Sequence, residues 1–72
     1  MKIKLNDYDQ GTFIKVIREW TGLTQKEFAK VLGKSERQIQ YYEAGTISYN
    51  VHFLKQITKE FDVDIYSEMK DK

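Results

Sequence analysis

The chain has 72 residues, with twelve Lys and Arg against eleven Asp and Glu and a formal net charge of +1 at pH 7. This length allows one domain with a modest core. The absence of cysteine excludes disulfides and thiolate metal sites, and a single histidine, His52, leaves no ligand set for zinc and no catalytic triad.

No apolar run approaches the roughly 20 residues of a membrane span, and the first ten residues lack the apolar stretch of a signal peptide. No nucleophile stands beside a matching base. We therefore expect a cytoplasmic protein that is not an enzyme, binds no metal, cofactor or small molecule, and does not enter membranes.

The charges are unevenly distributed. Residues 61–72 carry four acidic residues and two lysines, whereas residues 1–60 carry ten basic and seven acidic residues. The larger part of the chain is therefore mildly basic, which permits phosphate binding.

The first residues, "MKIKL", alternate like a strand, but no partner strand is evident, so we expect residues 1–9 to form an N-terminal arm. The first helix follows, with Phe13, Ile14 and Ile17 at helical spacing and Gly22 as its stop.

Two helices with capping boxes come next. Thr24 and Glu27 predict the start of one, which Gly33 ends; Ser35 and Gln38 predict the start of the other, over residues 36–44. Its inward residues are Ile39 and Tyr42, and Gly45 closes it.

Asn50 is a good N-cap for a fourth helix, in which Val51, Leu54, Ile57 and Phe61 recur at helical spacing. A short fifth turn is expected from Asp64, with Ile65 and Met69 inward. The sequence predicts a single all-α domain over residues 1–72, a compact four- to five-helix bundle with its core at 10–65 and a tail at 66–72.

The short connection "GKS" between the second and third helices forces a sharp turn. Two helices joined in this way have the geometry of a helix-turn-helix. Ala29 is small where the two helices approach, and Leu32 and Ile39 are apolar where the pair meets the core.

The stretch "GLTQKEFAKVLGKSERQIQYYEAG" resembles the helix-turn-helix of the phage repressor and Cro family of bacterial regulators. The similarity covers roughly residues 12–65 and includes the arginine of the first helix, Arg18. The resemblance implies a fold of the phage repressor DNA-binding type and a cytoplasmic, nucleoid-associated regulator from a bacterium or phage. Lys34, Glu36, Tyr41 and Tyr49 depart from the family pattern.

The third helix has an outward face opposite Ile39 and Tyr42, since successive residues turn by about 100°. This face suits the major groove, where base edges present hydrogen-bond donors and acceptors. Arg37 is expected to read guanine and Gln40 adenine. Glu36 can accept from cytosine or position Arg37, and Tyr41 can touch a thymine methyl or a phosphate.

Other polar residues are expected at the DNA backbone, where contacts fix the register of the protein. Lys34, Ser35 and Gln38 lie at the entrance of the third helix, and Lys26 is exposed near it. The resemblance implies the same role for Gln25 and for the loop residues Ser48, Tyr49 and Asn50. Asn50 has an equal alternative as a helix cap, and Lys26 as an ordinary surface lysine.

The resemblance also implies a structural pair between Arg18 and Glu43, and a homodimer acting on double-stranded DNA at two half-sites. The dimer is expected through the C-terminal region, with apolar candidates at Phe61, Val63, Ile65, Tyr66 and Met69.

The leading hypothesis is a sequence-specific transcriptional regulator that represses. Two alternatives remain open. One is an antitoxin or other protein-interaction module that uses the acidic tail, and the other is a degenerate helix-turn-helix that makes protein contacts only.

Overall fold

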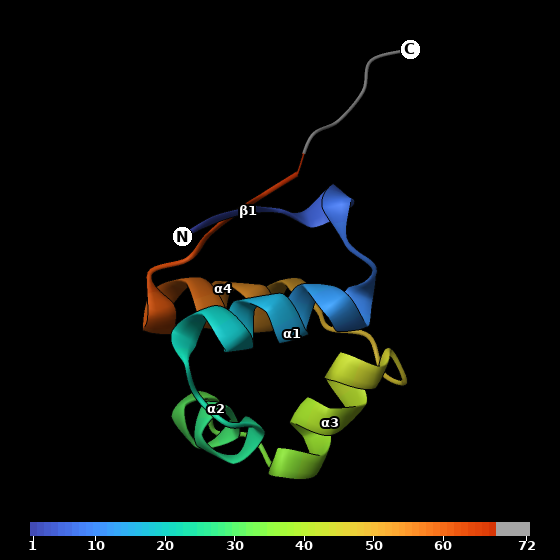
Figure 1. Cartoon of the computed structure of the whole chain (residues 1–72), viewed down its shortest axis with the longest axis vertical. Helices are drawn as coiled ribbons and strands as arrows, with labels where there is room; N and C mark the ends of the chain where they lie inside the picture. The colour runs from blue at the N-terminus through green and yellow to red at the C-terminus, as the bar shows by residue number, and fades with distance from the viewer. Residues whose placement is uncertain (68–72) are drawn as a thin grey trace.

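A computed structural model describes residues 1–67. The elements, in chain order, are β1 (Lys2–Lys4), a 3-10 turn (Leu5–Asp7), α1 (Gln10–Thr21), α2 (Gln25–Leu32), α3 (Glu36–Ala44), α4 (Val51–Phe61) and β2 (Asp64–Tyr66). In Figure 1, α1 and α4 run across the middle of the molecule. The strands lie on one side of these two helices, and α2 and α3 lie on the other.

The four predicted helices are confirmed, together with their caps. Both capping boxes are complete, with the Thr24 and Ser35 hydroxyls accepting from the backbone N–H groups of Glu27 and Gln38. Asn50 caps α4 through a 2.9 Å hydrogen bond from the Phe53 N–H to its Oδ1. These local bonds satisfy N–H groups that a helix leaves unpaired at its start.

The chain is mostly helical, as predicted, but it is not all-α, because the expected N-terminal arm contains a strand. Lys2–Lys4 forms a parallel strand pair with Asp64–Tyr66, with Ile3 opposite Ile65. The same pairing overturns the fifth helical turn expected at Asp64. The strands form because Ile3, only 3% exposed, becomes part of the core when it lies beside β2.

The chain reverses between α4 and β2 at Asp62, whose φ of 55° is the one positive value among the described non-glycine residues. Val63 follows and is 1% exposed, so its side chain lies in the core instead of on a dimer surface as expected. Phe61 is half-buried and stacks on Phe28 with ring centroids 5.1 Å apart. Met69 lies outside the described residues.

The core joins all four helices and both strands. Tyr42 of α3 stacks on Phe53 of α4 at 4.4 Å between centroids, which ties the third helix to the fourth. The fully buried larger side chains are Phe13, Phe28, Phe53, Ile14, Ile17, Leu32, Ile39, Ile57 and Val63.

Gly11, in the first turn of α1, marks a close approach between α1 and the end of α3. A Cβ at this position would lie 2.3 Å from the Glu43 carbonyl oxygen and 3.0 Å from the Gly45 backbone nitrogen. Both neighbours are backbone atoms, which cannot move aside as a flexible side chain would. Only glycine therefore lets α3 dock against α1 at this distance.

Substitution Gly11→Ala tests this contact. Alanine in a helix normally stabilises relative to glycine by roughly 0.5–1 kcal/mol. Here we expect the steric clash to outweigh this gain. The free energy of unfolding, measured by urea denaturation, should fall by about 1–3 kcal/mol. Lys15→Ala, at an exposed position of the same helix, is the control and should change stability by less than about 0.5 kcal/mol. A Gly11→Ala variant as stable as the parent would contradict the contact.

Candidate nucleic-acid interface

The two faces of α3 differ completely in burial. Ile39 is fully buried and Tyr42 is 8% exposed, so both anchor the helix in the core. The four residues expected to read bases, Glu36, Arg37, Gln40 and Tyr41, are all exposed. This face therefore offers cationic, anionic, amide and phenolic groups to a ligand, held on a helix whose other side cannot move freely.

The turn that leads into α3 consists of Gly33, Lys34 and Ser35. Gly33 takes the left-handed conformation with φ 69°, and the next N–H, of Lys34, donates to the Ala29 carbonyl at 2.9 Å. Glycine adopts this conformation without the steric cost that a Cβ brings. The turn ends α2 and starts α3 within three residues.

The expected backbone-contacting residues at this entrance already have protein partners. Lys34 is half-buried and its Nζ lies 5.4 Å from the centre of the Phe53 ring. The Ser35 hydroxyl and the Gln38 side-chain oxygen accept the two capping-box hydrogen bonds. The capping box leaves two donors of these side chains unused, the Ser35 hydroxyl hydrogen and the Gln38 amide nitrogen.

Glu43 connects three helices through its carboxylate. Its Oε2 accepts from Arg18 Nε at 2.5 Å, and its Oε1 accepts from Arg18 Nη2 at 3.2 Å and from Gln25 Nε2 at 3.1 Å. Arg18 also donates to the Leu23 carbonyl at 3.0 Å. The guanidinium of α1 and the amide of α2 therefore meet on one carboxylate of α3, a group that we call the Glu43 network.

The Glu43 network is largely removed from water, with the Arg18 and Glu43 side chains 15% and 6% exposed. The hydrogen bonds to Glu43 raise the pKa of Arg18, which favours the charged guanidinium. A charge-assisted, two-pronged pair of this kind also fixes orientation, because both parallel N–H groups must face both oxygens.

The loop between α3 and α4 contains the last three expected DNA-backbone residues. Ser48 is exposed, whereas Tyr49 is half-buried and packs on Phe13 with ring centroids 5.9 Å apart. Burial raises the pKa of the Tyr49 phenol, which therefore remains a neutral hydroxyl. Asn50 uses its Oδ1 as the cap of α4, the structural role that the sequence left open.

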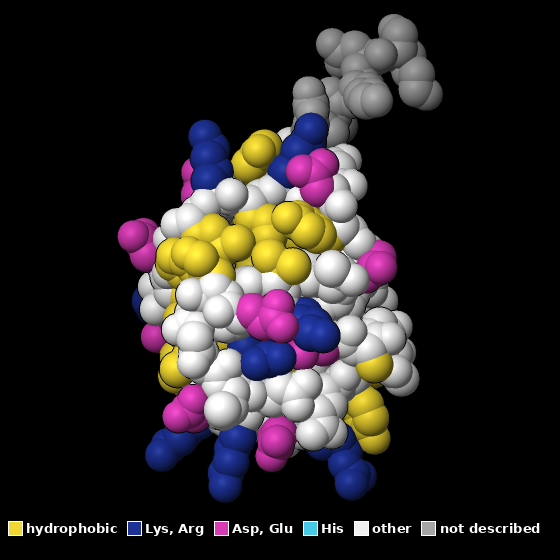
Figure 2. Space-filling model, viewed as in Figure 1, with side chains coloured by type: hydrophobic (Ala, Val, Ile, Leu, Met, Phe, Trp, Pro, Cys, Tyr) yellow, Lys and Arg dark blue, Asp and Glu magenta, His cyan; other side chains and the backbone are white. Residues whose placement is uncertain are grey.

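Basic side chains gather around the α2–α3 end. Figure 2 shows Lys and Arg side chains projecting from this end with acidic groups between them, and a band of hydrophobic side chains farther up, toward the strands. Lys26 and Lys30 of α2 and Arg37 of α3 are all exposed. Because basic and acidic side chains are mixed, this surface has no strong electrostatic potential of one sign. The selectivity of a ligand site here would come mostly from hydrogen bonds made by individual side chains.

Two contacts that position the site could not be predicted from the spacing of residues in the sequence. One is the hydrogen bond from Gln25 to Glu43, since a glutamine at a helix start is equally compatible with solvent. The other runs from Gln56 Nε2 of α4 to the Leu32 carbonyl at the end of α2, at 3.0 Å. Both depend on how the helices pack.

Residues 1–67 contain no cluster of three or more side chains of the types that bind metal ions. Over the same residues, no helix combines the length and apolar character needed to cross a membrane.

Comparison with known proteins agrees with this geometry. Residues 14–66 match the family described as Helix-turn-helix. The chain is also 38% identical over 63 residues to the antitoxin PezA of Streptococcus pneumoniae serotype 4 (strain ATCC BAA-334 / TIGR4). This alignment covers 83% of the chain but only 40% of PezA, so the chain spans less than half the length of that relative. No solved structure matches the chain.

The family match extends from α1 to the end of β2 and includes both helices that flank the glycine turn. The chain belongs to the helix-turn-helix family.

Proposed function

We propose that the protein binds double-stranded DNA at a specific sequence and represses transcription, with α2 and α3 as the helix-turn-helix and residues 36–44 in the major groove. The observation that carries the proposal is the polar, exposed face of α3 on a helix anchored by Ile39 and Tyr42. An α-helix fits the major groove of B-DNA, where its side chains reach the base edges. The protein would act on DNA in the cytoplasm.

We assign a DNA contact to each of the four exposed residues expected to read bases, according to its side-chain chemistry. Arg37 donates two hydrogen bonds to guanine, and Gln40 pairs with adenine. Glu36 accepts from a cytosine amino group or orients Arg37. Tyr41, 41% exposed, contacts a thymine methyl group or a phosphate.

The DNA backbone would be held by two groups of residues around this helix. Lys34, Ser35 and Gln38 lie at the entrance of α3, and Gln25 and Lys26 lie at the start of α2. The loop after α3 supplies Ser48, Tyr49 and Asn50. The Glu43 network supports the role of Gln25, because it fixes one amide hydrogen on Glu43 and leaves the second N–H as a directed donor.

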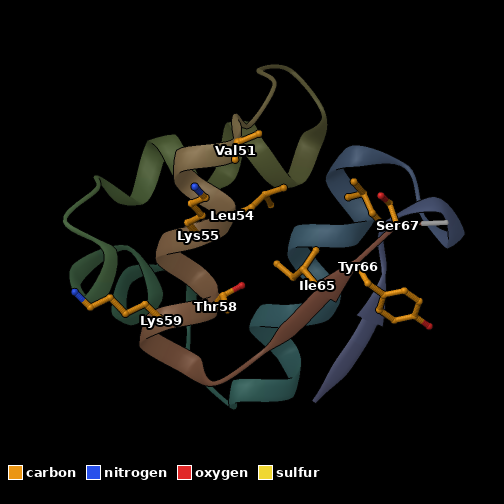
Figure 3. Close-up of a pocket in the computed structure, with 9 residues that line it drawn as sticks. Val51, Leu54, Lys55, Thr58, Lys59, Ile65, Tyr66 and Ser67 are labelled. Atoms are coloured by element: carbon orange, nitrogen blue, oxygen red, sulfur yellow. The ribbon is translucent and has the colours of Figure 1, made fainter. Parts of the chain in front are cut away.

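A homodimer fits the short length of sequence that a single α3 can read, since two copies would read two half-sites about one helical turn apart. The C-terminal region supplies the candidate contact surface. Tyr66 is 42% exposed there, whereas Ile65 is half-buried and points into the space between α4 and β2 (Figure 3).

The similarity to an antitoxin favours a second candidate function, in which this chain also binds a partner protein through its acidic tail. A truncation that tests the tail must begin after Ser67, because Val63 and the strand pair belong to the core. Loss of partner binding with intact DNA binding would favour this second function.

Selection of bound duplexes from a random pool tests the proposal directly. We expect one enriched motif, arranged as two mirrored half-sites. Affinity for that motif should fall as salt rises, with a log–log slope of about −0.9 for each phosphate neutralised. The absence of any enriched motif, together with no binding at low salt, would contradict DNA recognition.

The same selection repeated with Arg37→Ala tests the reading face. We expect relaxed preference at one base pair and an affinity loss of roughly 1–3 kcal/mol on the parent motif. Lys15→Ala, which removes one positive charge from an exposed site on α1, is the control and should leave the motif unchanged. Equal weakening by Arg37→Ala on all sequences would instead assign Arg37 to the DNA backbone.

A double-mutant cycle on Arg18→Ala and Glu43→Ala tests whether the Glu43 network holds α3 at one angle. We expect a coupling of about 1–3 kcal/mol in the free energy of unfolding, and coupling in DNA affinity as well, because the same bonds orient the reading helix. The exposed pair Lys15 and Glu19, four residues apart on α1, is the control cycle, with an expected coupling below about 0.5 kcal/mol. Coupling near zero for Arg18 and Glu43 in both measurements would overturn the positioning role.

A further inference from the structure

A groove of about 380 Å³ lies between α4 and β2 (Figure 3). In Figure 1, β2 lies on the side of α4 opposite α2 and α3. Leu54 of α4 and Ile65 of β2 point into the space between the two elements (Figure 3). Val51, Leu54, Lys55, Lys59 and Ile65 are among the residues that line it. Val51, at the start of α4, is 66% exposed and adds apolar surface to the groove.

The groove runs beside an open strand edge. Among residues 1–67, β2 pairs with β1 on one edge only, in a sheet of two strands. The Asp64 N–H points toward β1, where it donates to the Met1 carbonyl at 2.7 Å. Because backbone groups of successive strand residues face opposite edges, the N–H and C=O of Ile65 face away from β1. An extended segment in the groove can pair with this edge as a third strand.

Among the residues from 1 to 67 that line the groove, the charged ones have one sign. They are Lys55 and Lys59, one helical turn apart on α4, and none of these described lining residues has a carboxylate. An acidic segment with apolar side chains at alternate positions matches both the rim and the apolar floor. A symmetric contact between two copies would instead bring each groove against itself, with lysines facing lysines.

We propose that this groove binds an extended, acidic and apolar segment of a partner protein by adding it as a third strand beside β2. The apolar side chains of the segment lie on Leu54 and Ile65, its carboxylates face Lys55 and Lys59, and its backbone pairs with Ile65. DNA is a poorer occupant, because a phosphate backbone supplies neither alternating apolar groups nor strand hydrogen bonds. The site is separate from α3, so partner and DNA can bind together.

The probe for this proposal is a capped, fluorescent seven-residue peptide that alternates Glu with Val. We expect it to bind roughly tenfold more tightly than the matching peptide that alternates Lys with Val, by fluorescence anisotropy. The double variant Lys55→Glu with Lys59→Glu should reverse that preference. The control double variant Lys15→Glu with Lys30→Glu changes the net charge equally at exposed sites on α1 and α2, and should keep the preference for the acidic peptide.

Two further measurements separate strand addition from loose charge attraction. N-methylation of alternate peptide residues, in the register that removes donors facing β2, should abolish binding, while methylation in the other register should not. The amide signal of Ile65 should shift on titration with the acidic peptide. Equal affinity for both peptides, an unmoved Ile65 amide, or displacement of the peptide by a DNA duplex would overturn the proposal.

Self-association provides the remaining outcome. If sedimentation shows a dimer that the Lys55→Glu and Lys59→Glu variant dissociates or strengthens, the groove is an interface between copies and the proposal is wrong. If the acidic peptide binds the groove but the protein binds no DNA, the proposed groove is supported. Only the proposed DNA-binding function is then contradicted.

Discussion

The position of α3 depends on its contacts with α1. Glu43 receives Arg18 from α1 and Gln25 from α2, and its own carbonyl lies against Gly11. A buried ion pair contributes little net stability, because desolvation of the two charges offsets their attraction. Its value here is geometric, since two parallel hydrogen bonds and a backbone contact allow only a narrow range of helix angles. The exposed face of α3 can serve as a reading surface because its other contacts are fixed.

The strands and α4 form a second surface, at a distance from the exposed face of α3. The strand pair covers the end of the molecule opposite α2 and α3 (Figure 1). The side chain of Ile3 in β1 and that of Val63, the residue before β2, are both buried in the core. The stacking of Tyr42 on Phe53 then connects α3 to α4, which also forms one wall of the proposed groove. The fold thereby presents a polar helix at one end and an apolar, lysine-edged groove toward the other.

Features encoded by neighbouring residues were predictable from the sequence. The capping boxes at Thr24 and Ser35 and the glycine at position 33 define α2, α3 and the turn between them, since each depends on residues within one helical turn. The strand pair was not predictable in this way, because Lys2–Lys4 pairs with a parallel strand about 60 residues later in the chain. The reversal before β2 is made by Asp62 instead of a glycine, so the chain carries no conspicuous stop there. The Gln25–Glu43 bond and the Gly11 contact likewise arise from packing. The assignment of individual residues to bases or phosphates stays a prediction.

The most direct test of the central claim is an amide chemical-shift map of the protein titrated with a duplex taken from the random-pool selection. If α3 reads the DNA, the largest shifts fall on residues 34–41 and at the start of α2, around Gln25 and Lys26. The amides of β1 and β2 should then move little, since the strands lie at the opposite end (Figure 1). Shifts concentrated on the strands and α4, with α3 unchanged, would contradict the account.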